Sequence, residues 1–117
     1  MPARPTPTFL MLERATGART VPIEYRPIKV TVGDETHTLA LHQSAGQWLV
    51  SDPISGGGIA RITGWYNGMP VSSKGMGVRE ATAAARSTIA QLVHRHDGPD
   101  VWNTRLSAAR AMYARAQ

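Results

Sequence analysis

The stretch VSSKGMGVREATAAAR, residues 71–86, carries the residue types that bind phosphate: serines, a lysine and glycines ahead of a helix. A Walker-type loop needs its lysine to be followed at once by a hydroxyl residue, but Lys74 is followed by glycine. A less specific hypothesis is that the start of the helix, together with Lys74 and Arg79, binds one backbone phosphate. Because Glu80 could cap the same N–H groups, we favour a simple turn from hairpin to helix.

The histidines and serines lack the spacing of a metal or catalytic site. His94 and His96 point about 200° apart around a helix, and His37 and His42 face opposite sides of an expected strand. Ser72 and Ser73 lack a nucleophile elbow, and the chain has no cysteine. We therefore expect no metal, no cofactor and no enzymatic activity.

The charge favours an anionic partner. Thirteen basic residues against eight acidic ones give a net charge of +5 and a pI near 10.5. Nucleic acid is the commonest partner of such a chain, although an acidic protein surface is also suited to it. Eleven of the basic residues are arginine, which binds phosphate and carboxylate equally well and which a GC-rich genome would also favour.

The apolar runs are short. None approaches the roughly 20 residues of a membrane span, and the apolar part of MPARPTPTFLMLERA is too short for a signal peptide. The sequence therefore predicts a cytoplasmic protein with no membrane partner.

The chain divides into an arm and one domain. Prolines within residues 1–20 oppose a regular element, so we expect a partly flexible N-terminal arm that docks through Phe9, Leu10 and Leu12. Residues 21–117 are expected to form a single α+β domain.

Alternating apolar residues predict an antiparallel β-meander of four or five strands, followed by two C-terminal helices packed on one face. The expected strands are residues 21–32 with Pro27 marking an edge or a bulge, 36–42, 47–52, 59–66 and 69–72. Asn67-Gly68 predicts a type I′ turn before the last of these.

The helices are expected at about 78–96 and 101–115. Ala81, Ala85, Ile89, Leu92 and Val93 form the apolar face of the first helix. Asp97-Gly98-Pro99 ends that helix, and Asp100 is placed to cap the second.

Two parts of the sequence partially resemble known nucleic-acid-binding domains. Trp48, Gly64, Tyr66, REATAAA (79–85), Gly98 and Asn103 follow in an order that resembles the DNA-binding domain of plant ethylene-response factors and its phage relatives. That resemblance implies a three-stranded sheet whose tryptophan and arginines enter the major groove. It covers about half the chain; the loop after Tyr66 is long, and the strands carry as cations only Arg26, Lys29 and Arg61.

The stretch GMGVREATAAA (75–85) resembles the last helix of double-stranded-RNA-binding domains, whose start carries lysines over phosphates. This sequence offers only Lys74 and Arg79 there and lacks the expected first helix. Neither resemblance assigns a family.

Two hypotheses follow. The first is a non-enzymatic, nucleic-acid-binding accessory protein whose phosphate contacts are Arg61, Lys74, Arg79 and Arg86. The alternative is a protein-binding inhibitor or accessory factor, encoded by a phage or other mobile element, that uses Trp65, Tyr66 and Asn67. A homodimer fits both. Trp48, Trp65 and Trp102 are interpreted as core or lid residues in preference to base-stacking ones.

Overall fold

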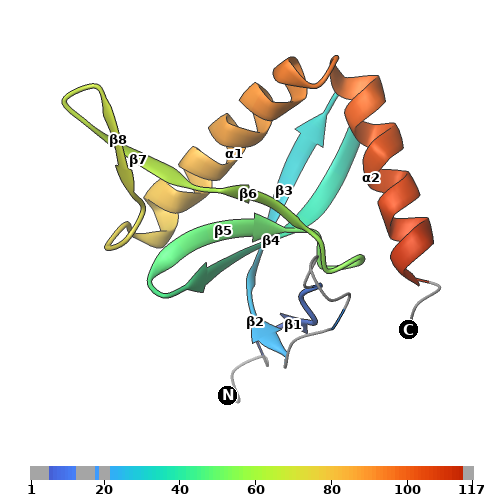
Figure 1. Ribbon diagram of the computed structural model, residues 1–117, viewed down its shortest axis with the longest axis horizontal. Helices are drawn as coiled ribbons and strands as arrows, with labels where there is room; N and C mark the ends of the chain where they lie inside the picture. The colour runs from blue at the N-terminus through green and yellow to red at the C-terminus, as the bar shows by residue number, and fades with distance from the viewer. Residues whose placement is uncertain (1–5, 13–17, 19–21, 115–117) are drawn as a thin grey trace, which may run out of the picture.

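The computed structural model describes residues 6–12, 18 and 22–114 of the 117-residue chain (Figure 1). Its strands are β1 (Thr8–Phe9), β2 (Ile23–Glu24), β3 (Arg26–Val32), β4 (Glu35–Ser44), β5 (Gln47–Ser51), β6 (Gly58–Arg61), β7 (Thr63–Tyr66) and β8 (Met69–Ser72). Its helices are α1 (Val78–Arg95) and α2 (Pro99–Ala114). The predicted α+β class is confirmed.

The main sheet is an antiparallel meander in the order β3-β4-β5-β6, as predicted. Pro27 lies in β3, which is an edge strand, so its missing N–H costs no ladder bond within the sheet. Apolar residues alternate along β3 and β4, and their inward side chains meet across the ladder, as at Ile28 opposite Leu39. This alternation gives the sheet one mainly apolar face, which also carries the buried His37.

The expected fourth strand, residues 59–66, is divided at Ile62. Its first half, β6, pairs with β5, and its second half, β7, pairs with β8 in a separate hairpin. Asn67 (φ 51°) and Gly68 (φ 76°) both have positive φ, which confirms the type I′ turn. The hairpin extends beyond the sheet because β7 continues past Gln47, the first residue of β5, and pairs only with β8 (Figure 1).

Helix α1 lies across the apolar face of the sheet (Figure 1). Ala81, Ala85 and Ile89 are fully buried, as the predicted face requires, while Leu92 and Val93 are half-buried. The two alanines allow the helix backbone to approach the sheet closely. The helix ends where predicted, with positive φ at Asp97 and Gly98.

Helix α2 begins two residues earlier than expected. Pro99 is its first residue, a position that suits proline because the first N–H of a helix has no partner within the helix. Asp100 therefore lies in the first turn and does not occupy the cap position.

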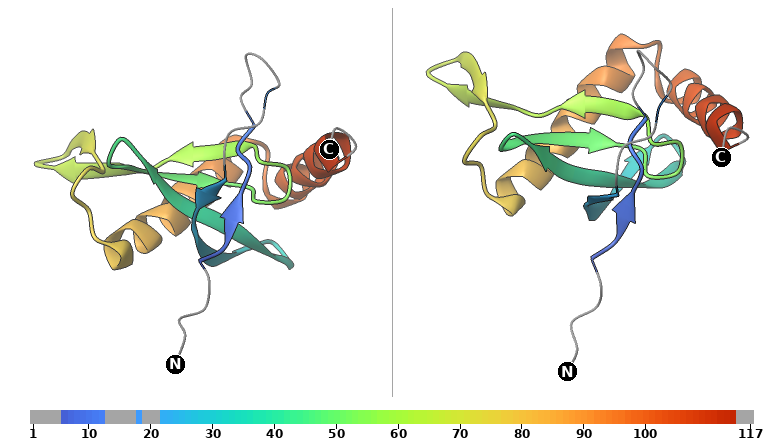
Figure 2. Two further views of the ribbon diagram at one scale, coloured as in Figure 1. Left: turned by 90° about the horizontal axis from the view of Figure 1, so that it is seen from below. Right: turned by 60° about the horizontal axis from the view of Figure 1, so that its bottom comes forward.

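The N-terminal segment lies on the face of the sheet opposite α1 (Figure 2). Phe9 is buried and its ring meets His42, which points away from α1, with ring centroids 5.1 Å apart. Leu12 is also buried, as expected, but Leu10 is 39% exposed. None of the helices in the described part of the chain is long and apolar enough to cross a membrane.

Because Ile89 is fully buried between α1 and the sheet, we expect Ile89→Ala to lower the free energy of unfolding by about 2–5 kcal/mol. Urea denaturation measures this change. Ser87→Ala, at an exposed position of the same helix, is the control and should change it by less than about 0.5 kcal/mol. Equal effects of the two substitutions would contradict the assigned helix face.

Candidate functional site

Trp48 holds the base of the β7–β8 hairpin. Its backbone N–H donates to Ser73 Oγ (2.8 Å), its indole Nε1–H donates to the Met76 carbonyl (2.8 Å), and its carbonyl accepts from Ile62 N–H (3.0 Å). The backbone of this buried residue therefore holds both ends of the hairpin, and its indole holds the loop before α1.

The same loop explains the motif at residues 71–86. Ser73 is buried and already bonded to Trp48, so it is not available to a phosphate. The Lys74 side chain packs on Gly46, where an added Cβ would lie 3.1 Å from Lys74 Cγ. Gly77 is the N-cap of α1 and no side chain caps it, so the capping role expected for Glu80 is absent. These contacts are those of a turn that joins a hairpin to a helix.

The hairpin presents two chemically different faces. Trp65 lies opposite Pro70, and these two residues share one face; Tyr66, Met69 and Val71 lie on the other. Trp65 is 68% exposed, and Tyr66, Met69 and Val71 are 70%, 67% and 42% exposed. Residues 62–73 contain no charged residue. Such an exposed apolar cluster is typical of interaction surfaces.

The Trp65 face borders a groove of about 520 Å³ between the β6–β8 segment and α1. The groove is lined by Arg61, Thr63, Trp65 and Pro70 from the strands and by Ser87, Thr88, Gln91 and Arg95 from the helix, together with Ile59, Ala60, Ala84 and Leu92. None of these lining residues is acidic. The groove thus combines an exposed aromatic ring with two arginines.

The predicted phosphate contacts do not form one cluster. Arg61 lines the groove, whereas Lys74 and Arg79 lie at the start of α1. Arg86 lies by β3, where its Nε–H donates to the Lys29 carbonyl (3.3 Å). Of the residues predicted for a protein partner, Trp65 lines the groove, while Tyr66 and Asn67 are exposed at the end of the hairpin.

Sequence reasoning missed Arg95 as a site residue. Ala84, Thr88, Gln91 and Arg95 recur at helical spacing and form one stripe of α1, a signal that is visible in the sequence. What the spacing does not show is that this stripe faces Arg61 and Trp65.

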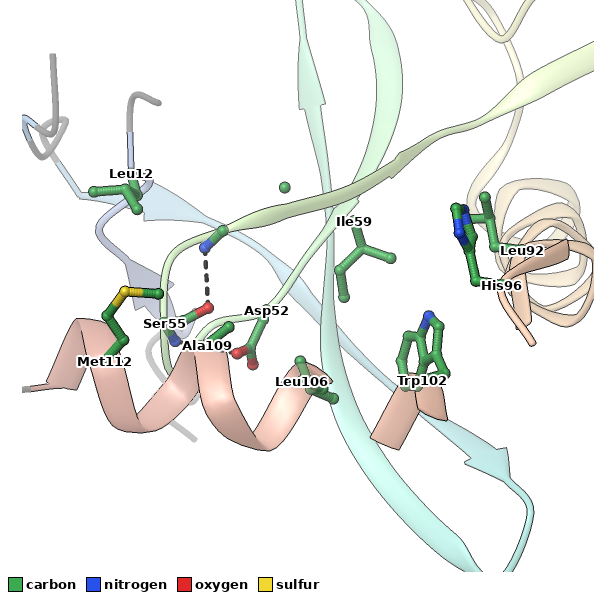
Figure 3. Close-up of a pocket in the computed structure, with 12 residues that line it drawn as sticks. Leu12, Asp52, Ser55, Ile59, Leu92, His96, Trp102, Leu106, Ala109 and Met112 are labelled. Atoms are coloured by element: carbon green, nitrogen blue, oxygen red, sulfur yellow. Dashed lines mark hydrogen bonds between the residues drawn. The ribbon is translucent and has the colours of Figure 1, made fainter. Parts of the chain in front are cut away.

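A second cavity, of about 350 Å³, lies under α2 (Figure 3). Its walls are mainly apolar: Leu12, Ile59, Leu92, Trp102, Leu106, Ala109 and Met112. The carboxylate of Asp52 at its border is fully engaged by the protein itself. Arg110 donates to both carboxylate oxygens (3.0 Å each), and the backbone N–H groups of Ile54 and Ser55 donate as well. Ser55 and His96 are the other polar side chains in the lining of this cavity.

Asp52 and Arg110 join the loop after β5 to α2. Burial alone would raise the pKa of Asp52, but hydrogen bonds from Arg110 and Ser55, the charge of Arg110 and the Ile54 N–H together lower that pKa below its ordinary value of 3.8. Asp52 is thus ionised at neutral pH and forms an ion pair with Arg110, which lies 58 residues later in the sequence.

Asn103 makes the other polar attachment of α2. Its Nδ2–H donates to the Val32 carbonyl (3.0 Å), so its Oδ1 accepts a hydrogen bond from His37 Nε2 (2.7 Å). The His37 ring also meets Trp102 edge to face. Both His37 and Asn103 are buried, and they act as packing groups.

His42 and Ser51 form a buried pair, with Nε2 and Oγ 2.8 Å apart. Burial lowers the pKa of His42, so the ring is neutral at pH 7. Its Nδ1 has no hydrogen-bond partner among the described residues, and Ser51 is inaccessible. A hydrolytic pair needs a group that orients the histidine and a serine that the substrate can reach, and this pair has neither.

Among the residues that the structure describes, no cluster of three acidic or histidine side chains could hold a metal ion.

No protein-family model, curated protein or solved structure matches the chain. The resemblance to ethylene-response factors also implies an exposed tryptophan on the sheet, whereas Trp48 is buried and Phe9 covers part of the opposite face. Trp102 is half-buried against the core, so two of the three tryptophans have the expected core role and Trp65 does not.

We expect Arg110→Ala to lower the free energy of unfolding at neutral pH by roughly 2–4 kcal/mol, because it leaves the Asp52 carboxylate buried without its charge partner. Urea denaturation measures the loss. Arg105→Ala removes an exposed arginine from the same helix and serves as the control.

The loss should depend on pH. Since the pKa of Asp52 is lowered on folding, its contribution is fully present above 3.8 and disappears as the pH falls below that value. The difference in stability between the native sequence and Arg110→Ala should therefore narrow from about pH 7 to about pH 3. A difference that does not change with pH would show that packing of Arg110, not its charge, dominates.

Proposed function

We propose that this protein is a small, non-enzymatic, nucleic-acid-binding accessory module and that the groove between the hairpin and α1 is its contact surface. One observation carries the proposal: Trp65, 68% exposed, shares the groove with Arg61 and Arg95 and with no acidic residue.

The chemistry of the groove fits this partner. Arginine pairs with phosphate oxygens through two parallel N–H donors, and an exposed indole is a stacking platform for a base. Thr63, Thr88 and Gln91 add uncharged donors and acceptors between the arginines. The net charge of +5 raises the local concentration of any polyanion around the molecule.

The proposal predicts the effect of removing the groove charges. Arg61→Gln together with Arg95→Gln should weaken binding to labelled DNA and RNA of all sequences. If each arginine neutralises one phosphate, the slope of log affinity against log salt should fall by about 1.4 for single strands. Fluorescence anisotropy over a range of salt concentrations measures both quantities.

Arg79→Gln together with Arg86→Gln is the matched control, because it also removes two positive charges but from positions on α1 that do not line the groove. It should lower the slope less than the groove pair does. Absence of binding by the native sequence at low salt would overturn the proposal, and equal effects of groove and control variants would move the contact surface elsewhere.

A second candidate function, a protein-binding inhibitor or accessory factor, is favoured by the other hairpin face. Tyr66, Met69 and Val71 are exposed there without any charge nearby in sequence. Aromatic residues and methionine are enriched, and charges depleted, at the centres of protein interfaces.

This candidate predicts that a stoichiometric partner co-purifies with the native protein from its source cells at high salt. The partner should be lost with Tyr66→Ala plus Met69→Ala and retained with Arg61→Gln plus Arg95→Gln. The reverse pattern would contradict it.

A further inference from the structure

We infer that the groove binds single-stranded nucleic acid by stacking an unpaired base on Trp65, and that it discriminates against a duplex. This inference rests on the proposed function and narrows it, since it names the form of nucleic acid that the site takes.

Trp65 is the first reason. The hairpin that carries it is closed by a two-residue turn and held at its base by Trp48, so the backbone beneath the indole is fixed at both ends. Its ring is 68% exposed on the groove face. A base can cover that ring only if the face of the base is free. In a duplex the bases cover one another's faces and present only their edges.

The positions of the arginines are the second reason. Arg61 ends β6 and Arg95 ends α1, so one cation stands on each wall of a groove whose other lining residues are uncharged. This arrangement suits one phosphate backbone that runs between the walls. Arg79 and Arg86 lie elsewhere on α1, and Lys74 lies in the loop before it, packed on Gly46. The predicted cations therefore do not form the broad surface that spans both backbones of a duplex.

The size of the groove is the third reason. A volume of about 520 Å³ lies within the range that holds a drug-sized ligand. Such a space can take a base with its sugar and phosphate, but it cannot admit the width of a double helix. Thr63, Thr88 and Gln91 can then meet the edges of the bound base, which are free of Watson–Crick partners.

The test compares forms of one sequence. The full-length protein is titrated by fluorescence anisotropy with a labelled single-stranded oligonucleotide, its complement and the blunt duplex, as DNA and as RNA, at one salt concentration. We expect both single strands to bind at least tenfold more tightly than the duplex. Trp65→Ala should weaken single-strand binding about 5- to 100-fold, whereas Trp65→Phe, which keeps an aromatic face, should lose much less.

Tyr66→Ala is the matched control, because Tyr66 is equally exposed but lies on the other face of the hairpin. It should leave single-strand binding unchanged. Circular dichroism checks folding of each variant, and Trp65→Phe tests stacking even if Trp65→Ala proved unstable. Single-strand binding that Trp65→Ala does not weaken would overturn the inference.

The outcomes distinguish the stacking inference from the proposed function. Duplex binding that equals or exceeds single-strand binding, and that still depends on Arg61 and Arg95, would overturn the stacking inference and leave the proposed function standing. Failure to bind any of these nucleic acids at low salt would remove both.

Discussion

The position of the hairpin, and with it the groove, depends on the hydrogen bonds of one buried residue, Trp48. Three hydrogen bonds from this residue reach Ile62, Ser73 and Met76, which are respectively the start of the hairpin, its end and the loop before α1. An indole N–H in a core must find an acceptor, and here the acceptor is the backbone of the segment that directs the chain into α1. Trp48 therefore ties the hairpin wall of the groove to the loop that leads into α1, while the buried face of α1 positions the helix on the sheet.

The sheet itself offers little free surface for recognition. Helix α1 covers one face, and Phe9 packs on His42 on the other. Helix α2 is fastened to the end of the sheet by Asn103 and to the loop after β5 by Arg110. Four of the seven exposed large apolar side chains of the described residues lie on the hairpin, which extends beyond the sheet (Figure 1).

The hairpin does not need to bury its aromatic side chains, because its turn and its strand pairing set its conformation. The Asn67-Gly68 turn fixes the register, so Trp65 and Tyr66 point to opposite sides without help from a core. The two sides then meet different surroundings. Trp65 faces a groove with arginines on both walls, whereas Tyr66 shares its face of the hairpin with Met69 and Val71. One short element thus supplies two surfaces suited to different partners.

The sequence by itself determined the parts of this fold that depend on neighbouring residues. Alternation in β3 and β4, the Asn67-Gly68 turn, the alanine face of α1 and the Asp97-Gly98 helix end all follow from local geometry, and each was predicted. The division of residues 59–66 at Ile62 was not, because it depends on where the antiparallel neighbour β5 begins. Of the site, Arg61 and Trp65 were predicted, but as contacts for two different partners. Only the tertiary structure brought them together with Arg95, because the path of α1 over the sheet decides which stripe of the helix faces β6. The pairs Asp52 and Arg110, and His37 and Asn103, lie 58 and 66 residues apart, and no local pattern specifies which such distant polar groups will meet.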